Sequence, residues 1–298
     1  MSRDPFPNQP EIDDWTWRTP AAVEDDSNRD RGSESEPLAS DERQRPEIDD
    51  SVRFYYLRDR TCLLRESEFA TLFEIGKFRV INWKDLAQFG YAGDAKRLDR
   101  DVRHLLQQGL VEVKSTRCVD RDAEKLLVLT KKAKRLLLQS GRLPEGQAIY
   151  HGLVKPREAS HDAALYRVYQ RESARIESAA GRPLRVTLDY ELMRNLFREL
   201  AQLGDQAQSR EARERVAWKQ GLVLVHDQVQ IPDLRLEFET ADHELRHIDL
   251  ELVTRNYRPR GLAQKAQAGF SIYAPREDVS KLRRIFDASE LTTRIFAV

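Results

Sequence analysis

Carboxylate side chains lie on two neighbouring segments, at positions that paired strands would bring close together. Asp233 follows Pro232 at the start of one run of alternating apolar and polar residues, and Asp249 and Glu251 lie in the next run. Such alternation predicts half-buried strands, and a hairpin of the two would place all three carboxylates on its polar face. Carboxylates held close together repel one another unless a proton or a divalent cation lies between them. The pattern therefore predicts a shared proton or a bound divalent cation, and carboxylate sites accept both Mg²⁺ and Mn²⁺.

This pattern resembles the PD-(D/E)xK nuclease superfamily, in which an aspartate after a proline and an acid on the next strand hold Mg²⁺. The usual lysine, two residues after the second acid, is missing, because Glu251 and Val253 occupy the places where it could stand. The superfamily is known to move this lysine to the following helix, so the resemblance implies that Lys265 takes its role. An inactive fold that only holds DNA, or a plain hairpin with solvated acids, would show the same residues.

A further acid lies on a helix predicted over residues 161–179. His161 and Glu172 fall on its broad apolar face, where an unpaired carboxylate is costly to bury. Nucleases of the class that the chain resembles commonly add one acid from the helix before the sheet, which implies Glu172 as a catalytic residue. The alternative is that Glu172 pairs with an arginine such as Arg175 or Arg194.

Residues 51–140 carry a different pattern. Helices are expected over about 63–75, 82–90 and 94–109, followed by two strand-like runs joined by a polar loop. This order is typical of a winged helix-turn-helix, whose third helix enters the major groove of DNA. The predicted DNA-binding residues are Lys96, Arg97, Arg100, Arg103 and His104 on that helix, and Arg117 and Arg121 in the loop. Nearby aspartates dilute the positive face, and a protein-binding winged helix is the alternative.

Together these motifs resemble the replication-relaxation family of plasmids and other mobile elements. The resemblance covers about residues 62–280 and includes His161-Asp162, Pro232-Asp233 and Lys265. It implies a role in the replication or topology of DNA, in which the protein nicks or relaxes a duplex by metal-dependent hydrolysis. One alternative is a non-catalytic DNA-binding regulator or replication accessory factor with an inactive nuclease fold. Another is a nuclease-fold toxin or defence component that the acidic arm inhibits.

Charge is unevenly distributed along the 298 residues, although the formal net charge is zero. Residues 1–50 contain fifteen Asp and Glu against six Arg, a balance of −9, so residues 51–298 carry +9. The first segment is rich in Pro, Ser, Asp and Glu and has no sustained periodicity, which predicts disorder. It is expected to be a solubilising tail, a partner-binding arm, or an acidic segment that competes with DNA.

Several other classes of protein are not supported. The first thirty residues lack the apolar core of a signal peptide, and no apolar run approaches the ~20 residues that span a bilayer, so a cytoplasmic location without membrane contact is expected. The two cysteines form no CxxC motif. The HExxH string at 243–247 lies where a hairpin turn is expected, rather than on the helix that zinc proteases need. Trp218 is expected in the core.

The sequence therefore predicts an α/β protein in four parts. These are a disordered acidic arm over residues 1–50, a winged helix-turn-helix DNA-binding domain over 51–140, a linker over 141–158, and a restriction-endonuclease-like domain over 159–298. The expected catalytic residues are Asp233, Asp249, Glu251, Lys265 and Glu172, and the expected metal ligands are Asp233, Asp249 and Glu251. Double-stranded DNA, a second copy of the chain and a protein partner for the arm are the expected partners.

Overall fold

A computed structural model describes residues 51–297, apart from 59, 117–123, 154–157, 254–258 and 288–293. The chain divides into two units, residues 1–46 and 47–298, and only the second contains described residues. The predicted acidic arm and the loop arginines Arg117 and Arg121 lie outside the described residues. Within the described part, no helix is both long enough and apolar enough to cross a membrane.

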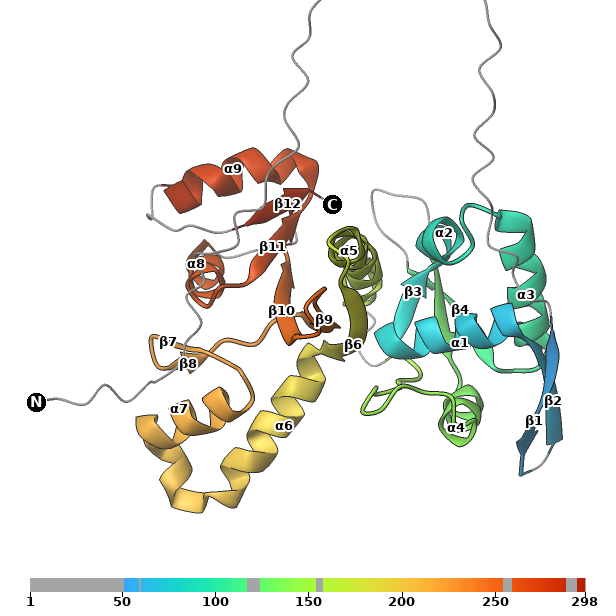
Figure 1. The fold of residues 1–298 in the computed structure, drawn as a ribbon, viewed down its shortest axis with the longest axis horizontal. Coiled ribbons are helices and arrows are strands. Elements are labelled where there is room, and N and C mark those ends of the chain that lie inside the picture. Colours follow the sequence, from blue (N-terminus) through green and yellow to red (C-terminus); the bar gives the residue numbers. More distant parts are fainter. Residues whose placement is uncertain are drawn as a thin grey trace, which may run out of the picture. The chain divides into compact units, whose positions relative to one another are not determined.

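The first part of the described chain combines a hairpin, helices and a small antiparallel sheet (Figure 1). In chain order its elements are β1 (Val52–Leu57), β2 (Arg60–Arg65), α1 (Glu66–Phe78), β3 (Val80–Asn82), α2 (Trp83–Asp85), the π-helical η2 (Leu86–Gly90), α3 (Ala95–Gln107), β4 (Val111–Thr116), β5 (Glu124–Leu129) and α4 (Lys131–Gln139). β1 pairs with β2, and the second sheet has the order β3-β5-β4. The first helix begins later than predicted, because β2 occupies its expected start.

Capping interactions fix where the helices of this part begin and end. Asp94 accepts a hydrogen bond from Arg97 N (3.0 Å) at the start of α3, and Thr130 accepts one from Ala133 N (3.3 Å) at the start of α4. Each cap satisfies a backbone N–H that has no partner within its helix. Gly109, with a φ of 62°, follows α3 in the left-handed conformation that glycine adopts without steric cost. The predicted start and end of the third helix are confirmed.

The second part of the described chain is built on a five-stranded mixed sheet with helices around it. Its elements are α5 (Ala159–Ser178), β6 (Arg182–Leu188), α6 (Asp189–Gln202), the 3₁₀-helical η3 (Gly204–Gln208), α7 (Arg210–Lys219), β7 (Leu224–Val225), β8 (Gln228–Val229), β9 (Leu234–Glu239), β10 (Leu245–Leu252), α8 (Pro259–Gln267), β11 (Ser271–Ala274), α9 (Arg276–Asp287) and β12 (Ile295–Ala297). The sheet order is β12-β11-β10-β9-β6. β6, β9 and β10 are antiparallel neighbours, and β10, β11 and β12 are parallel. The expected α/β class and the β9–β10 hairpin are confirmed.

The two faces of this sheet differ in character because side chains alternate along each strand. Leu234 and Leu236 on β9, with Leu250 and Leu252 on β10, belong to a buried apolar cluster that also contains residues of α5. The intervening polar positions, which include the predicted acids of β10, therefore lie on the opposite face. The alternation of the sequence correctly predicted this division.

Helix α5 joins the two parts of the described chain. It contacts β3 on one side and β6, β9 and β10 on the other, as Figure 1 shows. Phe78 at the end of α1 packs edge-on against Tyr166 of α5, with ring centroids 5.2 Å apart. Arg167 of α5 forms a two-point hydrogen-bonded ion pair with Asp85, at 3.0 and 3.1 Å. One continuous apolar cluster includes residues from both parts.

The segment predicted as a linker is packed where it is described. Gln147 is 7% exposed, and its side chain exchanges hydrogen bonds with the backbone N and O of Val186 on β6. Ile149 is 3% exposed, and Tyr150 N donates to Gly76 O at 2.8 Å. Residues 147–150 therefore connect α1 to the five-stranded sheet by direct contacts.

Replacement of Phe78 with alanine should lower the free energy of unfolding by about 3–5 kcal/mol, the usual cost of removing a large buried aromatic side chain. Phe78 is 1% exposed, and its loss would leave a cavity against α5. Phe197 on α6 is 61% exposed, so its replacement with alanine is a matched control and should change the free energy by about 0.5 kcal/mol or less. Urea unfolding measures both values, and equal losses in the two variants would contradict this packing.

Candidate active site

Glu251 and Lys265 form the centre of the candidate site. Glu251 on β10 is 5% exposed, and Lys265 on α8 donates to its Oε2 atom at 2.8 Å. Lys265 also donates to the backbone carbonyl of Ile231, just before β9. The lysine implied on the following helix thus lies beside an acid of the strand. Val253, where a strand lysine could have stood, is instead buried in an apolar cluster with Leu262 of α8.

Asp233 lies next to this pair. Its Oδ2 atom accepts a hydrogen bond from Leu252 N at 2.8 Å, which ties the start of β9 to the end of β10. His161 on α5 has its Nε2 atom 3.5 Å from the same oxygen. The structure therefore brings together Asp233, Glu251 and Lys265 of the predicted set and adds His161. The position of His161 on the apolar face of its predicted helix could have identified it as a member of this cluster.

Burial and charge shift the titration of this cluster. Burial and the charge of Asp233 raise the pKa of Glu251 to about 7, although Lys265 opposes the shift. Burial lowers the pKa of His161, but its interaction with Asp233 and the charges of Asp162 and Glu251 outweigh burial and leave this pKa above its ordinary value. Burial also raises the pKa of Asp162 to about 6, against the opposing charge of His161. The cluster therefore changes its protonation near neutral pH, as is common at functional sites.

Asp249 does not join this cluster. It lies opposite Arg235 in the register of β9 and β10, and Arg235 donates to both of its carboxylate oxygens, at 2.7 and 2.8 Å. The same guanidinium donates to the backbone carbonyls of Gln220 and Gly221 at 2.6 and 2.8 Å. The side chains of this pair are only 7% and 11% exposed. Asp249 therefore holds β9 and β10 together and is not available to bind a cation.

The predicted metal ligands are thus not assembled as a set of three. Among the residues that the structure describes, no group of three or more His, Cys, Asp or Glu side chains is arranged to hold a metal ion. Glu172, the acid expected from the preceding helix, is 2% exposed and accepts hydrogen bonds from Tyr273 Oη (2.5 Å) and Arg175 Nη1 (2.9 Å). The alternative of an ion pair with Arg175 is confirmed, and Glu172 stabilises the packing of α5 on β11.

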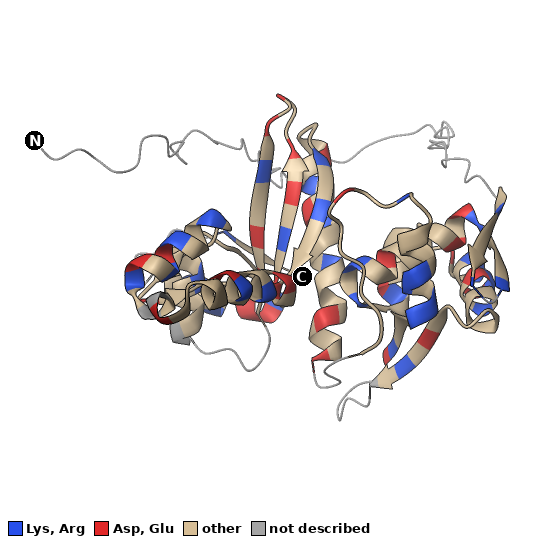
Figure 2. Cartoon of the chain, turned by 90° about the horizontal axis from the view of Figure 1, so that it is seen from below, with Lys and Arg blue, Asp and Glu red and all other residues tan. Residues whose placement is uncertain are grey.

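Most of the predicted basic residues of α3 have acidic neighbours. Arg100 and Arg103 pair with adjacent aspartates of the same helix. His104 is hydrogen-bonded at 2.7 Å to Glu68, which is fully buried on α1, so it contributes to the packing of the two helices. Basic and acidic positions are interspersed across the described chain (Figure 2). Of the predicted residues, Lys96, Arg100 and Arg103 are exposed, and Arg97 and His104 are half-buried.

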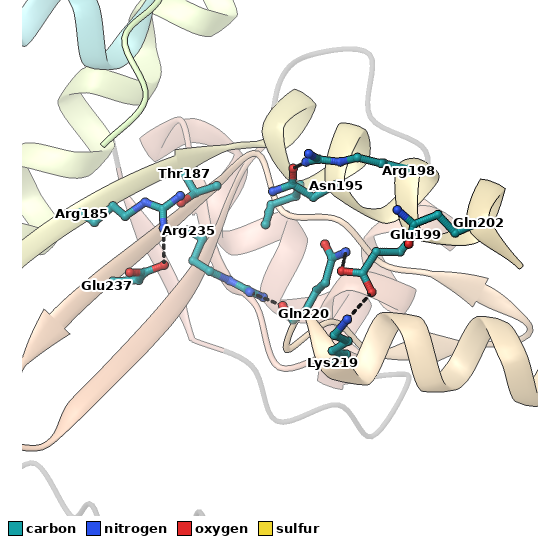
Figure 3. A pocket seen from close by; sticks show the side chains of 11 residues that line it. Arg185, Thr187, Asn195, Arg198, Glu199, Gln202, Lys219, Gln220, Arg235 and Glu237 are labelled. Atoms are coloured by element: carbon teal, nitrogen blue, oxygen red, sulfur yellow. Dashed lines mark hydrogen bonds and ion pairs between the residues drawn. The ribbon is translucent and has the colours of Figure 1, made fainter. Parts of the chain in front are cut away.

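A polar cavity of about 540 Å³ lies between β6, β9 and the helices α6 and α7 (Figure 3). Its charged side chains are largely paired, because Lys219 contacts Glu199 at 3.0 Å and Arg185 lies 3.8 Å from Glu237. The sequence did not predict this cavity, because its lining residues are spread over β6, α6, α7 and β9. Trp218, the neighbour of Lys219 on α7, is 72% exposed, so the prediction that it lies in the core was wrong.

Comparison of the chain with models of known protein families, with curated proteins and with solved structures finds no match.

Replacement of Asp249 with alanine should lower the free energy of unfolding by about 3–5 kcal/mol, because it leaves the buried Arg235 without its carboxylate. A double variant, Arg235→Met with Asp249→Leu, should recover much of this loss, since no unpaired charge remains in it. Urea unfolding of the three proteins measures the effect. An Asp249→Ala variant as stable as the wild type would show that the ion pair does not hold the strands together.

Glu251 should make the protein less stable as the pH rises. Because folding raises the pKa of Glu251 from 4.5 to about 7, the folded chain binds this proton more tightly than the unfolded chain does. The resulting stability is fully present below a pH of about 4.5 and is lost as the pH rises to about 7. Glu251→Gln should remove this component. The difference in unfolding free energy between the two proteins should therefore change across this interval, and a constant difference would contradict the assignment.

Proposed function

We propose that the protein binds duplex DNA of a plasmid or other mobile element and cleaves a phosphodiester bond in it with the help of a divalent cation. The observation that carries this proposal is the meeting of Asp233, Glu251 and Lys265 where β9 begins, β10 ends and α8 packs. Two acids from adjacent strands and a lysine from the following helix are the arrangement that the PD-(D/E)xK resemblance implies. On this proposal, residues 159–298 form a nuclease-like domain.

The order of elements in residues 51–140 supports the DNA-binding half of the proposal. Three helical segments precede the antiparallel strands β4 and β5, which is the order of a winged helix-turn-helix. Helix α3 would then enter the major groove and offer the exposed side chains of Lys96, Arg100 and Arg103 to phosphates and base edges. Because aspartates partly neutralise this helix, contacts with the bases would add to the attraction between charges.

The donor set fits Mg²⁺ or Mn²⁺ held mainly by two carboxylates. Within the described residues, hydrogen bonds engage Asp233 Oδ2 and Glu251 Oε2, and a cation would be held through the other oxygen of each carboxylate. Mg²⁺ is usually bound through one or two carboxylates, with water and substrate phosphate completing its coordination. The raised pKa of Glu251 agrees with this interpretation, because a cation would balance the charge of the two adjacent carboxylates.

Each residue of the cluster then has a separate task. Asp233 and Glu251 would hold the cation, which supplies an activated water and stabilises negative charge on the phosphate when it is bound. Lys265 would donate to the scissile phosphate and stabilise the charge that develops there during cleavage. His161, 3.5 Å from Asp233, would orient the Asp233 carboxylate.

A non-catalytic DNA-binding regulator or replication accessory factor is the second candidate. Three of the predicted catalytic residues have structural partners. Asp249 binds Arg235, Glu172 accepts from Tyr273 and Arg175, and Lys265 donates to the carbonyl of Ile231 as well as to Glu251. With these contacts the sheet could hold DNA, or a second copy of the chain, without cutting.

A supercoiled plasmid distinguishes the two candidates. With Mg²⁺ or Mn²⁺, the wild type should produce nicked or linear circles, and EDTA should prevent their formation. Lys265→Met should slow cleavage by at least about 100-fold, because it removes one donor to the developing charge, and Asp233→Asn should abolish cleavage. Lys219→Met, on the exposed side of α7, is the control and should cut like the wild type. Intact plasmid that the wild type and Asp233→Asn both retard in a gel would support the second candidate.

A further inference from the structure

The hairpin of β1 and β2 has apolar side chains on both of its faces. On the inner face, Tyr55 is buried and stacks on Phe69 of α1, with ring centroids 5.3 Å apart. On the outer face, Phe54 is 65% exposed and Tyr56 is 75% exposed. Leu63, the partner of Phe54 across the hairpin, is 43% exposed. The outer face is therefore an apolar surface in contact with solvent.

Such a face needs a physical explanation. An antiparallel sheet that buries one face normally presents polar residues on the other, and apolar surface gathered in one exposed place marks a site of interaction. Phe54 and Tyr56 are two residues apart on one strand, which separates their rings by roughly 7 Å. At this spacing, each ring can stack on one flat, unsaturated group of a ligand.

Positive charge surrounds these rings. Residues 51–65 contain four Arg and one Asp, a balance of +3. Arg53, Arg58 and Arg60 are exposed. The Arg53 guanidinium lies 3.9 Å from Glu66, and both side chains of this pair reach solvent. Arg60 donates to the backbone carbonyl of Gln108, a neutral acceptor that carries no opposite charge. The surface thus combines exposed aromatic rings with an excess of cations.

From this combination we propose that the outer face of the β1–β2 hairpin binds single-stranded DNA. Phe54 and Tyr56 stack on successive bases, and the arginines contact the phosphates. Aromatic rings within a positively charged surface are the usual means of holding an unpaired strand. A duplex does not fit this chemistry, because its base faces are covered by neighbouring base pairs. The choice of DNA over RNA rests on the proposed function, whereas the stacking argument does not.

The test measures the affinity of the full chain for a labelled oligo-dT by fluorescence anisotropy, beside an oligo-U RNA of the same length. In the hairpin variant, Phe54→Leu with Tyr56→Leu, the face stays apolar but loses both rings. Stacking contributes about 1–3 kcal/mol for each base, so the affinity for oligo-dT should fall by about 30-fold or more. The control variant, Phe197→Leu with Trp218→Leu, removes two exposed rings from α6 and α7 and should bind like the wild type. Tyr56→Phe keeps the ring and should also keep the affinity.

Four results would overturn the proposal: no binding of oligo-dT by the wild type, an unchanged affinity in the hairpin variant, an equal loss in the control variant, or tighter binding of oligo-U. If sedimentation shows a wild-type dimer that the hairpin variant converts to a monomer with unchanged affinity for oligo-dT, the face is an interface between copies of the chain. Asp233→Asn should bind oligo-dT like the wild type. Failure of plasmid cleavage and failure of this proposal are therefore distinguishable.

Discussion

The bidentate ion pair between Arg235 and Asp249 is the constraint on which the sheet of the second part depends. A guanidinium that is removed from water costs several kcal/mol unless its donors are satisfied. Here Asp249 and the carbonyls of Gln220 and Gly221 accept from Nε, Nη1 and Nη2. The Arg235 side chain reaches all of these acceptors in only one register of β9 and β10, because a slip of one residue would turn it toward the apolar face of the sheet. The pair therefore fixes β9 against β10 and both strands against the turn after α7.

The position of the candidate site follows from this register. With Asp249 opposite Arg235, Leu250 pairs with Leu234, and the start of β9 lies beside the end of β10. Asp233 and Glu251 then come together from separate strands, and Lys265 reaches both the Glu251 carboxylate and the carbonyl before β9. Asp249, which was predicted as a metal ligand, thus has a structural role. The register that it fixes brings Asp233 and Glu251 together.

The sequence predicted the helices and strands better than it predicted which side chains interact. Alternation predicted β9 and β10 as a hairpin, the residue pattern over 94–109 predicted the limits of α3, and the superfamily resemblance implied Lys265 on the helix after the strand. Alternation could not decide whether Asp249 binds a metal ion or forms an ion pair. Arg235 and the three acids all lie at the polar positions of the alternating pattern, so both interactions were possible. It also could not show that β2 takes the start of the first predicted helix, because Leu63 and Leu64 suit a strand as well as a helix. Trp218 was misassigned because a large aromatic residue is more often buried than exposed.

Helix α5 has a thermodynamic consequence for the described unit. Its residues pack against α1 and β3 on one side and against the five-stranded sheet on the other, so neither part can lose its structure without exposing apolar surface of the other. Folding of the two parts is accordingly coupled, as expected when one core is shared. A ligand that binds the folded form of either part also stabilises the other through mass action. The DNA contact proposed for the first part would in this way reduce the frequency with which the sheet opens.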